Sequence, residues 1–370
     1  MSPTDKLRSA WVLQARIPLE PLCSRIRPAV FAKGKDEGGK PEPFLALGHR
    51  YLDAPQDTVI LDSPASMANR MEEALYALRA ELGLNDIRVD FGDVAYSVWQ
   101  LPHRIYDAAV RDSQWSDQEF FQTDLGKKLA LGDPQALFQW SPNSLLFGSW
   151  NSHAQAGIGA RLAPRIERAV LAEVLGLGPK RVPRPGSRRD PLGIPGDAML
   201  TEAYKERAMA LGIGETNALS TLGFGNVPPT LQDLDVSVQE GVLDFLCTRI
   251  PLEQRRLPEP AQGVLVLLGL LGLASLLERG VLHLRSGTAL RVGRVALRAF
   301  PGEEEFSLPP KEELIGGIKA LLKELPEGWR WTGEELVLTP LPALQEIYEG
   351  QHQLRADTKR KRAGGGQKEG

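Results

Sequence analysis

Residues 62–70 (DSPASMANR) carry the residue types that bind anions. Ser66 and Asn69 stand at the expected start of a helix, where backbone N–H groups lack partners and the helix dipole favours negative charge. Arg70 follows them, and its planar guanidinium can donate two hydrogen bonds to one phosphate. The segment therefore indicates contact with a phosphate or a sugar. The alternative is structural, with Ser66 capping the helix and Arg70 paired with a nearby acid such as Glu73.

A second segment, residues 141–153 (SPNSLLFGSWNSH), joins aromatic residues to short hydrogen-bonding ones. Proteins that bind single-stranded RNA combine aromatic surfaces, on which bases stack, with polar groups of this kind. The candidate contacts are Asn143, Ser144, Trp150, Asn151 and His153. The same composition suits a buried turn packed on Trp140 and Phe147, and the sequence leaves both alternatives open.

The histidines and cysteines show none of the spacings typical of a metal or hydrolase site. The histidines are His49, His103, His153, His283 and His352. Cys23 and Cys247 are too few and too far apart for a zinc site or a disulfide framework, and their apolar neighbours predict buried thiols. We therefore expect no catalytic residue, no metal and no cofactor.

The 370-residue chain has the composition of a globular protein, with 42% hydrophobic residues and a net charge of −3. The negative charge counts against a nucleic-acid-binding protein unless the basic residues are concentrated in a groove. Clusters of Arg and Lys at 16–40 and 180–189 provide such a concentration. The N-terminus lacks the apolar core of a signal peptide, and the apolar stretch 263–277 is shorter than a membrane span. We expect a buried helix there and a soluble, cytoplasmic protein.

Hydrophobic periodicity predicts the elements that must position these residues. A strand is expected over 11–17, with Trp11, Leu13, Ala15 and Ile17 on one face.

A β-α-β unit is expected over about 58–91, from the strand 58–61 (TVIL) to the strand 87–91. Its helix begins near Ser66 and ends at Gly83. The apolar stripe of this helix is Met71, Leu75, Leu78 and Leu82.

The remaining segments are predicted from composition and turn signals. They are a charged loop at 32–43, an insertion at about 100–157 with a helix over 116–131, an exposed basic loop at about 178–197, a strand at 236–238, a helix at 311–325, a hairpin at 329–339 and a disordered basic tail at 351–370.

Several segments, in order along the chain, together resemble one protein family. They are RIRPAVF, SPASMANRMEEAL after TVIL, SPNSLLFGSWNSH, LGFGNVPP before VSV, and LRSGTAL. They look like the signature segments of the backbone RAMP protein of type I-G (formerly I-U) CRISPR systems, the Csb-type, seventh-class Cas subunit. The resemblance runs from about Arg16 to Leu290. Phe224 stands where the family pattern has a histidine between two glycines.

The resemblance implies an α+β fold with a ferredoxin-like (RRM-like) palm, inserted helical fingers and a thumb extension. Residues 1–350 would form one elaborated RAMP domain, with the palm at about 10–100 and 158–300 and the fingers at about 100–157.

The resemblance also implies a non-catalytic subunit of the Cascade effector. Such a subunit binds guide crRNA along its spacer, stacks head to tail with its own copies, contacts other Cascade subunits and supports pairing with target DNA. No membrane is involved. The implied RNA contacts are Arg25, Arg27, Lys33, Lys35, Ser66, Asn69, Arg70, His103, Arg104, Asn143, Ser144, Trp150, Asn151, His153, Gly225 and Asn226.

The alternative function is a RAMP endoribonuclease that processes guide RNA or cleaves target RNA. Such an enzyme needs a His or Asp positioned near the RNA as general base, and the candidates are His103, His153 and Asp62. A metabolic enzyme with an unrecognised site is a third class.

Overall fold

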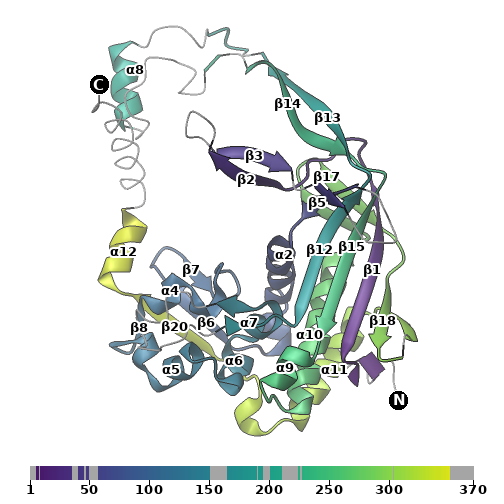
Figure 1. Ribbon diagram of the computed structural model, residues 1–370. Helices are drawn as coiled ribbons and strands as arrows, with labels where there is room; N and C mark the ends of the chain where they lie inside the picture. Colours follow the sequence, from purple (N-terminus) through teal and green to yellow (C-terminus); the bar gives the residue numbers. More distant parts are fainter. Residues whose placement is uncertain are drawn as a thin grey trace. The chain divides into compact units, whose positions relative to one another are not determined.

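Figure 1 shows the computed structural model of the chain. It describes residues 6–7, 9–35, 41–45, 47–49, 57–150, 165–189, 191–194, 201–210, 224–225, 227–302 and 304–350. The contacts divide the chain into two compact units, Met1–Arg181 with Leu234–Leu341 and Val182–Asp233 with Pro342–Gly370. The fold is mixed α+β, as predicted. That residues 1–350 form one domain stays a prediction.

The main sheet of the first unit has nine strands among the described residues, in the order β16-β17-β1-β15-β12-β5-β4, with β18 paired to β1 and to β19. The neighbouring strands of the central part are antiparallel. The strands are β1 (Val12–Pro21), β4 (Leu47–His49), β5 (Asp57–Asp62), β12 (Val170–Leu177), β15 (Glu240–Thr248), β16 (Val281–Arg285), β17 (Thr288–Val292), β18 (Ala296–Phe300) and β19 (Glu304–Ser307).

Strand β1 confirms the predicted alternation. Leu13, Ala15 and Ile17 are buried, and the residues between them are exposed, because successive side chains of a strand point to opposite faces. Trp11 was expected on the buried face, but it precedes the strand and is 42% exposed.

Helix α2 (Pro64–Tyr76) confirms the strongest helix prediction in its position, but its start is corrected and it ends at Tyr76, before the predicted stop. Ser63, and not Ser66, is the N-cap, since its side chain accepts a hydrogen bond from the backbone N–H of Ser66. Pro64 then occupies the first turn, where its missing N–H has no cost. A short helix α3 (Arg79–Leu82) ends at Gly83, whose φ of 68° is left-handed, as the predicted stop requires.

The predicted β-α-β unit is wrong. Strand β5 belongs to the nine-stranded sheet, whereas β6 (Asp86–Asp90) belongs to a separate five-stranded sheet in the order β7-β6-β20-β8-β9. Both flanking strands were correctly placed in sequence, but periodicity does not tell which partner a strand pairs with. The other strands of this sheet are β7 (Ala95–Ser97), β8 (Ser113–Trp115), β9 (Gln118–Glu119) and β20 (Glu335–Pro340).

Helix α10 (Glu259–Leu277) is the predicted buried helix. By length and composition it is the one helix of the described residues that could cross a membrane, but most of it is buried within the protein. Its glycines permit close packing: a Cβ at Gly269 would lie 2.8 Å from Cγ2 of Val170 in β12, and one at Gly272 would lie 3.1 Å from Cε of Met71 in α2. Figure 1 shows α2 and α10 beside the long strands β12, β15 and β1.

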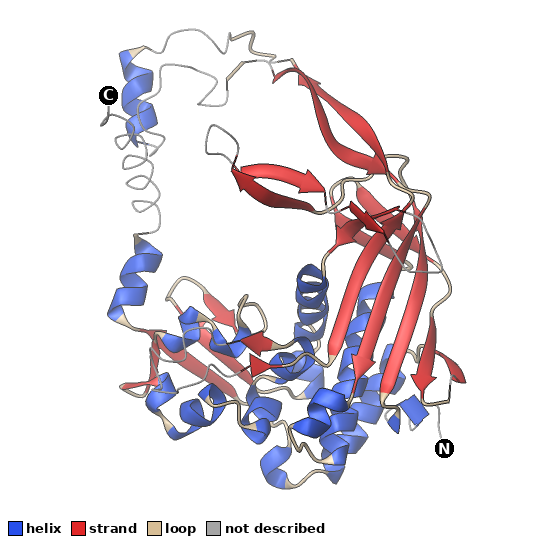
Figure 2. Ribbon diagram, in the orientation of Figure 1, coloured by secondary structure: helices blue, strands red, loops and turns tan. Residues whose placement is uncertain are grey.

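Residues 104–147 form a run of short helices (Figure 2). They are η1 (Arg104–Tyr106), α4 (Ala108–Arg111), η2 (Phe120–Gln122), α5 (Asp124–Ala130), α6 (Pro134–Trp140) and α7 (Pro142–Phe147). The single helix expected over 116–131 is therefore wrong. Ser116 and Asp117 have φ of 50° and 65°, so a left-handed turn between β8 and β9 precedes the helical part.

Two further segments were placed correctly in the sequence but differ in structure from the prediction. The charged loop at 32–43 is partly a hairpin of β2 (Val30–Lys35) and β3 (Pro41–Leu45). The hairpin at 329–339 is instead η5 (Glu327–Trp329) followed by β20. The first unit also contains the helices α9 (Ile250–Gln254) and α11 (Lys311–Glu324).

Part of the predicted basic loop at 178–197 is a strand, β13 (Lys180–Arg188), which pairs with β14 (Val227–Ser237). Pro183 and Pro185 suggested a loop because proline donates no ladder hydrogen bond. The two prolines are two residues apart, so the N–H groups that they lack would all lie on one edge of the strand. A strand with a single partner uses only one edge for pairing, so prolines at this spacing are compatible with a two-stranded sheet. The second unit also holds α8 (Glu202–Ala210) and α12 (Pro342–Glu349). The tail 351–370 lies outside the described residues.

Candidate functional site

Arg70, the central candidate of the first polar segment, forms an ion pair at the start of α2. Its Nε lies 2.8 Å from Oδ2 of Asp62, the last residue of β5, and its Nη2 donates to the backbone oxygen of Leu284 in β16. Asp62 is fully buried. The structural alternative was thus right that Arg70 pairs with an acid, although the acid is Asp62 and not Glu73.

Arg285 completes this cluster and was missed by the sequence analysis. Its Nη2 lies 2.7 Å from Oδ1 of Asp62, and its Nη1 donates to the backbone oxygens of Leu61 at 2.6 Å and Arg27 at 3.1 Å. One buried carboxylate therefore faces two guanidinium groups, and the three side chains carry a net charge of +1. The segment LRSGTAL was noticed only as a motif, because a strand pattern does not reveal a partner more than 200 residues away.

Arg27 and Arg25 add positive charge to the same region. The carbonyl of Arg27 accepts hydrogen bonds from Arg285 and from the hydroxyl of Thr288 at 2.6 Å, so its backbone is fixed to the β16–β17 hairpin. The Arg27 side chain is 3.5 Å from Asp235 and is 38% exposed. Arg25 lies in the preceding bend and is exposed.

A second buried cluster contains three more residues of the predicted contact set. Arg104 binds both oxygens of Glu72 on α2 and donates to the backbone oxygen of Gly148 at 2.8 Å. The amide of Asn143 donates to Glu72 at 2.9 Å and to the carbonyl of Val98 at 3.1 Å. Ser144 is fully buried and shares a hydrogen bond with Ser141.

These contacts give Arg104, Asn143 and Ser144 partners within the protein, which is a structural role; that they also contact RNA stays a prediction. Their polar atoms bond within the protein, so the second alternative for residues 141–153, a buried turn, holds for Asn143 and Ser144. Burial raises the pKa of Glu72 above its usual value of 4.5, against the hydrogen bonds from Arg104 and Asn143 that lower it.

Arg104 also has a φ of 54°, in the left-handed region that non-glycine residues rarely adopt. The bidentate contact with Glu72 and the bond to Gly148 hold this conformation in place.

Four predicted contacts are exposed or half-buried and keep their candidate status. Ser66 is half-buried and Asn69 exposed, both in the first turns of α2. His103 is exposed, directly before Arg104. Trp150 is 63% exposed, in the short strand β10 (Ser149–Trp150).

The structure describes no side-chain position for the other predicted contacts. Lys33 and Lys35 lie in β2, but their side chains are outside the described part of the chain, as are Asn151, His153 and Asn226 entirely. Gly225, in the second unit, has a φ of 93°, which only glycine adopts readily.

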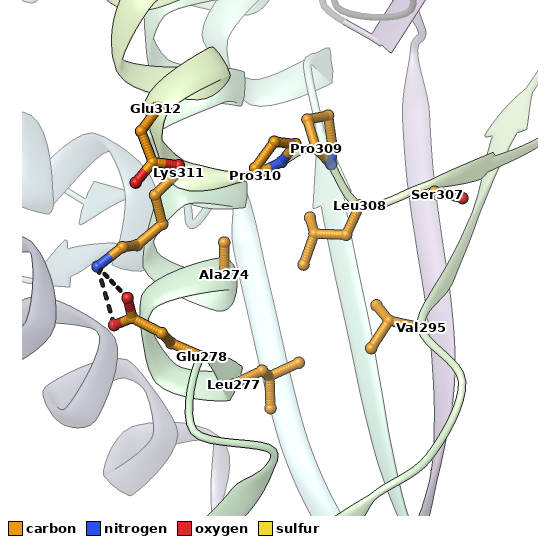
Figure 3. A pocket seen from close by; sticks show the side chains of 10 residues that line it. All are labelled: Ala274, Leu277, Glu278, Val295, Ser307, Leu308, Pro309, Pro310, Lys311 and Glu312. Carbon is orange, nitrogen blue, oxygen red and sulfur yellow. Dashed lines mark hydrogen bonds and ion pairs between the residues drawn. The ribbon is translucent and has the colours of Figure 1, made fainter.

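Figure 3 shows a pocket of about 360 Å³ between the end of α10 and the start of α11. Apolar side chains such as Leu277 and Leu308 line it, and an ion pair joins Lys311 to Glu278 at 2.8 Å. None of the predicted contacts lines this pocket, so we assign it no role. In the described part of the chain, no group of three or more His, Cys, Asp or Glu side chains could hold a metal ion.

Part of the chain matches a known protein family. Residues 13–180 match the family model of CRISPR-associated protein GSU0053. The match covers the chain from β1 to the end of β12, which is somewhat less than half of the sequence, and over this stretch the chain is similar to CRISPR-associated proteins. It does not distinguish type I-G from other types. No curated protein matches the chain.

Proposed function

We propose that the protein is a non-catalytic backbone subunit of a type I CRISPR effector complex. In this role it binds guide crRNA along the spacer, assembles head to tail with its own copies and supports pairing of the guide with target DNA. The observation that carries the proposal is the match of residues 13–180 to a CRISPR-associated family. The finer assignment to type I-G rests on the motif resemblance alone.

The strand order supports an RRM-like palm. Apart from the outer strands β4, β5 and β16 and the inserted elements, the chain runs β1, α2, β12, β15, α10, β17, and these strands lie side by side in the order β17-β1-β15-β12. This order agrees with the β-α-β-β-α-β sequence of a ferredoxin-like fold, in which the first strand lies between the fourth and the third. The helix of the first crossover is α2, which packs against β12. The hairpin β13–β14, inserted between β12 and β15, takes the place of the thumb.

The distribution of charge supports RNA binding despite the net charge of −3. Arg70 and Arg285 pair with the buried Asp62, Arg27 pairs with the buried Asp235, and the exposed Arg25 lies two residues before Arg27. This region therefore has an excess of positive charge, which attracts a phosphate backbone without regard to base sequence. A guide-binding subunit needs this independence, because the spacer sequence varies.

One of the three candidate general bases for the nuclease alternative does not fit that role. Asp62 is buried and held on both oxygens by arginines, so it is not placed to accept a proton from RNA. His103 is exposed and remains to be tested, and His153 lies outside the described residues.

The test is purification of the full chain from a host that expresses a CRISPR array, followed by incubation with labelled RNA. The proposal predicts discrete co-purified RNA, an excess of absorbance at 260 nm, and a mobility shift without new fragments. New RNA fragments that disappear in His103→Ala would instead establish the nuclease. Sedimentation with RNA of increasing length should show growing assemblies, because a head-to-tail contact that does not close adds copies indefinitely.

A charge-reversal pair serves as control. Arg25→Glu should weaken RNA binding, whereas Arg279→Glu makes the same charge change at an exposed arginine between α10 and β16 and should have less effect. Equal effects of the two variants would mean that net charge alone, and not this region, governs the binding.

A further inference from the structure

Three tryptophans of the described residues are exposed, and their surroundings differ. Trp11 is 42%, Trp115 40% and Trp150 63% exposed. Single exposed aromatic residues are common and carry no meaning by themselves. The residues around each tryptophan distinguish the three.

The ring of Trp11 already has a cation as partner, since the guanidinium of Arg249 lies 5.8 Å from the ring centre. Trp115 lies in β8, beside a turn that carries the exposed acids Asp117 and Glu119. A nucleic acid would be repelled there.

Trp150 has basic neighbours. It pairs directly with Arg165 of β11 (Arg165–Ile166), and directly opposite residues of an antiparallel pair place their side chains on the same face, with Cβ atoms about 4.5–5.5 Å apart. Both side chains are exposed. Arg168 is exposed three residues further on, and its Cβ would lie 3.3 Å from a Cβ built at Gly148.

The backbone that carries Trp150 is fixed at three points. Arg104 donates to the carbonyl of Gly148, the hydroxyl of Ser149 donates to the carbonyl of His103 at 3.1 Å, and β10 pairs with β11. The exposed His103 is thereby brought beside Ser149. The fold thus fixes the backbone of an exposed indole next to two exposed arginines, Arg165 and Arg168, with one exposed acid, Glu167, between them in sequence. A fixed backbone lowers the entropy lost when a ligand binds.

From this arrangement we infer that Trp150 is a stacking platform for one unpaired base of single-stranded RNA, with Arg165 beside it as the contact to an adjacent phosphate. Stacking suits a subunit that must accept any spacer, because every base presents a π-face. The inference rests on the proposed function, and it specifies how the site binds. It also gives a structural role to Arg104, which positions the platform without touching RNA.

The test compares four proteins as full chains: wild type, Trp150→Ala, Trp150→Phe and the matched control Trp115→Ala. The probes are a single-stranded mixed-sequence oligoribonucleotide and the same ribose-phosphate chain with abasic residues. On the oligoribonucleotide, Trp150→Ala should bind roughly tenfold or more weakly than wild type, Trp150→Phe should recover most of the loss, and Trp115→Ala should match wild type. On the abasic chain all four proteins should bind alike, because no base is present to stack.

The possible failures are distinguishable. If wild type binds neither probe, the proposed function fails and the platform with it. Two outcomes refute the platform while RNA binding stands. In the first, wild type binds RNA and Trp150→Ala binds it as well as Trp115→Ala does. In the second, Trp150→Ala loses as much affinity for the abasic chain as for the oligoribonucleotide. Melting temperatures of the four proteins show whether a loss of binding reflects a loss of fold. If Trp150→Ala is unfolded, Trp150→Phe decides: a folded Trp150→Phe protein that binds RNA as weakly as Trp150→Ala refutes the platform.

Arg165→Gln provides a second readout. Removal of one phosphate contact should lower the slope of log affinity against log salt by about 0.7 for single-stranded RNA. An unchanged slope would remove Arg165 from the site.

Discussion

Arg104 binds both carboxylate oxygens of Glu72, with Nε 2.7 Å from Oε1 and Nη2 2.8 Å from Oε2. The acid belongs to α2, which packs on the main sheet, and the arginine to η1, at the start of the run of short helices. Both side chains are largely buried, at 4% and 12% exposure. The pair therefore ties these helices to the main sheet through α2.

Arg104→Ala should lower the free energy of unfolding by about 3–5 kcal/mol, because it leaves a buried carboxylate without its counter-charge. Urea unfolding followed by circular dichroism measures this. Glu335→Ala is the control, since it breaks the half-exposed pair with Arg88 and should cost less than about 1 kcal/mol. Equal losses in the two variants would contradict the role given to Arg104.

Arg70→Ala should lower the free energy of unfolding by about 1–3 kcal/mol, since the bonds to Asp62 and to the carbonyl of Leu284 are lost. The variant should also bind RNA more weakly, because a charge-assisted contact to phosphate is lost. Asn69→Ala is the matched control, because Asn69 is the exposed neighbour on the same helix. It should melt like wild type, so any loss of RNA affinity in this variant reports a contact and not a change in stability.

Leu75→Ala should lower the free energy of unfolding by about 2–5 kcal/mol, because Leu75 is fully buried and its removal leaves a cavity against α10. Leu131→Ala makes the same change at a residue that is 62% exposed, and its melting temperature should stay within about 1 °C of wild type if the cost is only a few tenths of a kcal/mol. A Leu75→Ala protein as stable as Leu131→Ala would show that α2 does not pack as described.

The two cysteines should differ in reactivity. Cys247 is buried, and burial raises the pKa of its thiol from 9.0 to about 12, so almost no thiolate is present at pH 8. Cys23 is exposed, against the sequence prediction that both thiols are buried. A thiol reagent at pH 8 should therefore modify one cysteine in the native protein and both after denaturation.

The pH dependence follows from the sign of the shift at Cys247. Since the pKa is raised in the folded state, the contribution of the protonated thiol to stability is complete below pH 9 and is lost as the pH rises through about 12. Cys247→Ala should reduce the loss of stability over this interval. An equal loss in both proteins would assign the alkaline instability to other groups.

RNA affinity should fall steeply with salt and depend little on base sequence. Each phosphate neutralised in single-stranded RNA adds about 0.7 to the slope of log affinity against log salt. Binding measured between 50 and 300 mM salt with two unrelated oligoribonucleotides tests both statements. A flat salt dependence, or a strong preference for one of the sequences, would contradict a guide-binding role.

Much of the local structure could be predicted from the sequence, because local rules determine it. The alternation in β1, the apolar stripe of α2, the stop at Gly83 and the buried helix α10 all follow from periodicity and turn chemistry. These features need no knowledge of distant residues.

Pairing between distant segments could not be predicted. Strand β20 lies parallel to β6, with Glu335 opposite Asp86, and Arg285 reaches Asp62 across 223 positions of the chain. Neither relation leaves a periodic signal. The same limit explains the site: Arg104 and Asn143 have the residue types of RNA contacts, and only the position of Glu72 shows that they are bound within the protein.

The five-stranded sheet has a consequence for synthesis on the ribosome. Its centre is β20, and without this strand the sheet reduces to two separate hairpins, β6–β7 and β8–β9. Residues 335–340 emerge from the exit tunnel some 220 residues after β9. Until then, the edges of β6 and β8 are unpaired, and unpaired edges are sites of aggregation. The nascent chain therefore depends on its last described strand to protect segments translated long before, and a ribosome that stalls before residue 335 leaves them exposed.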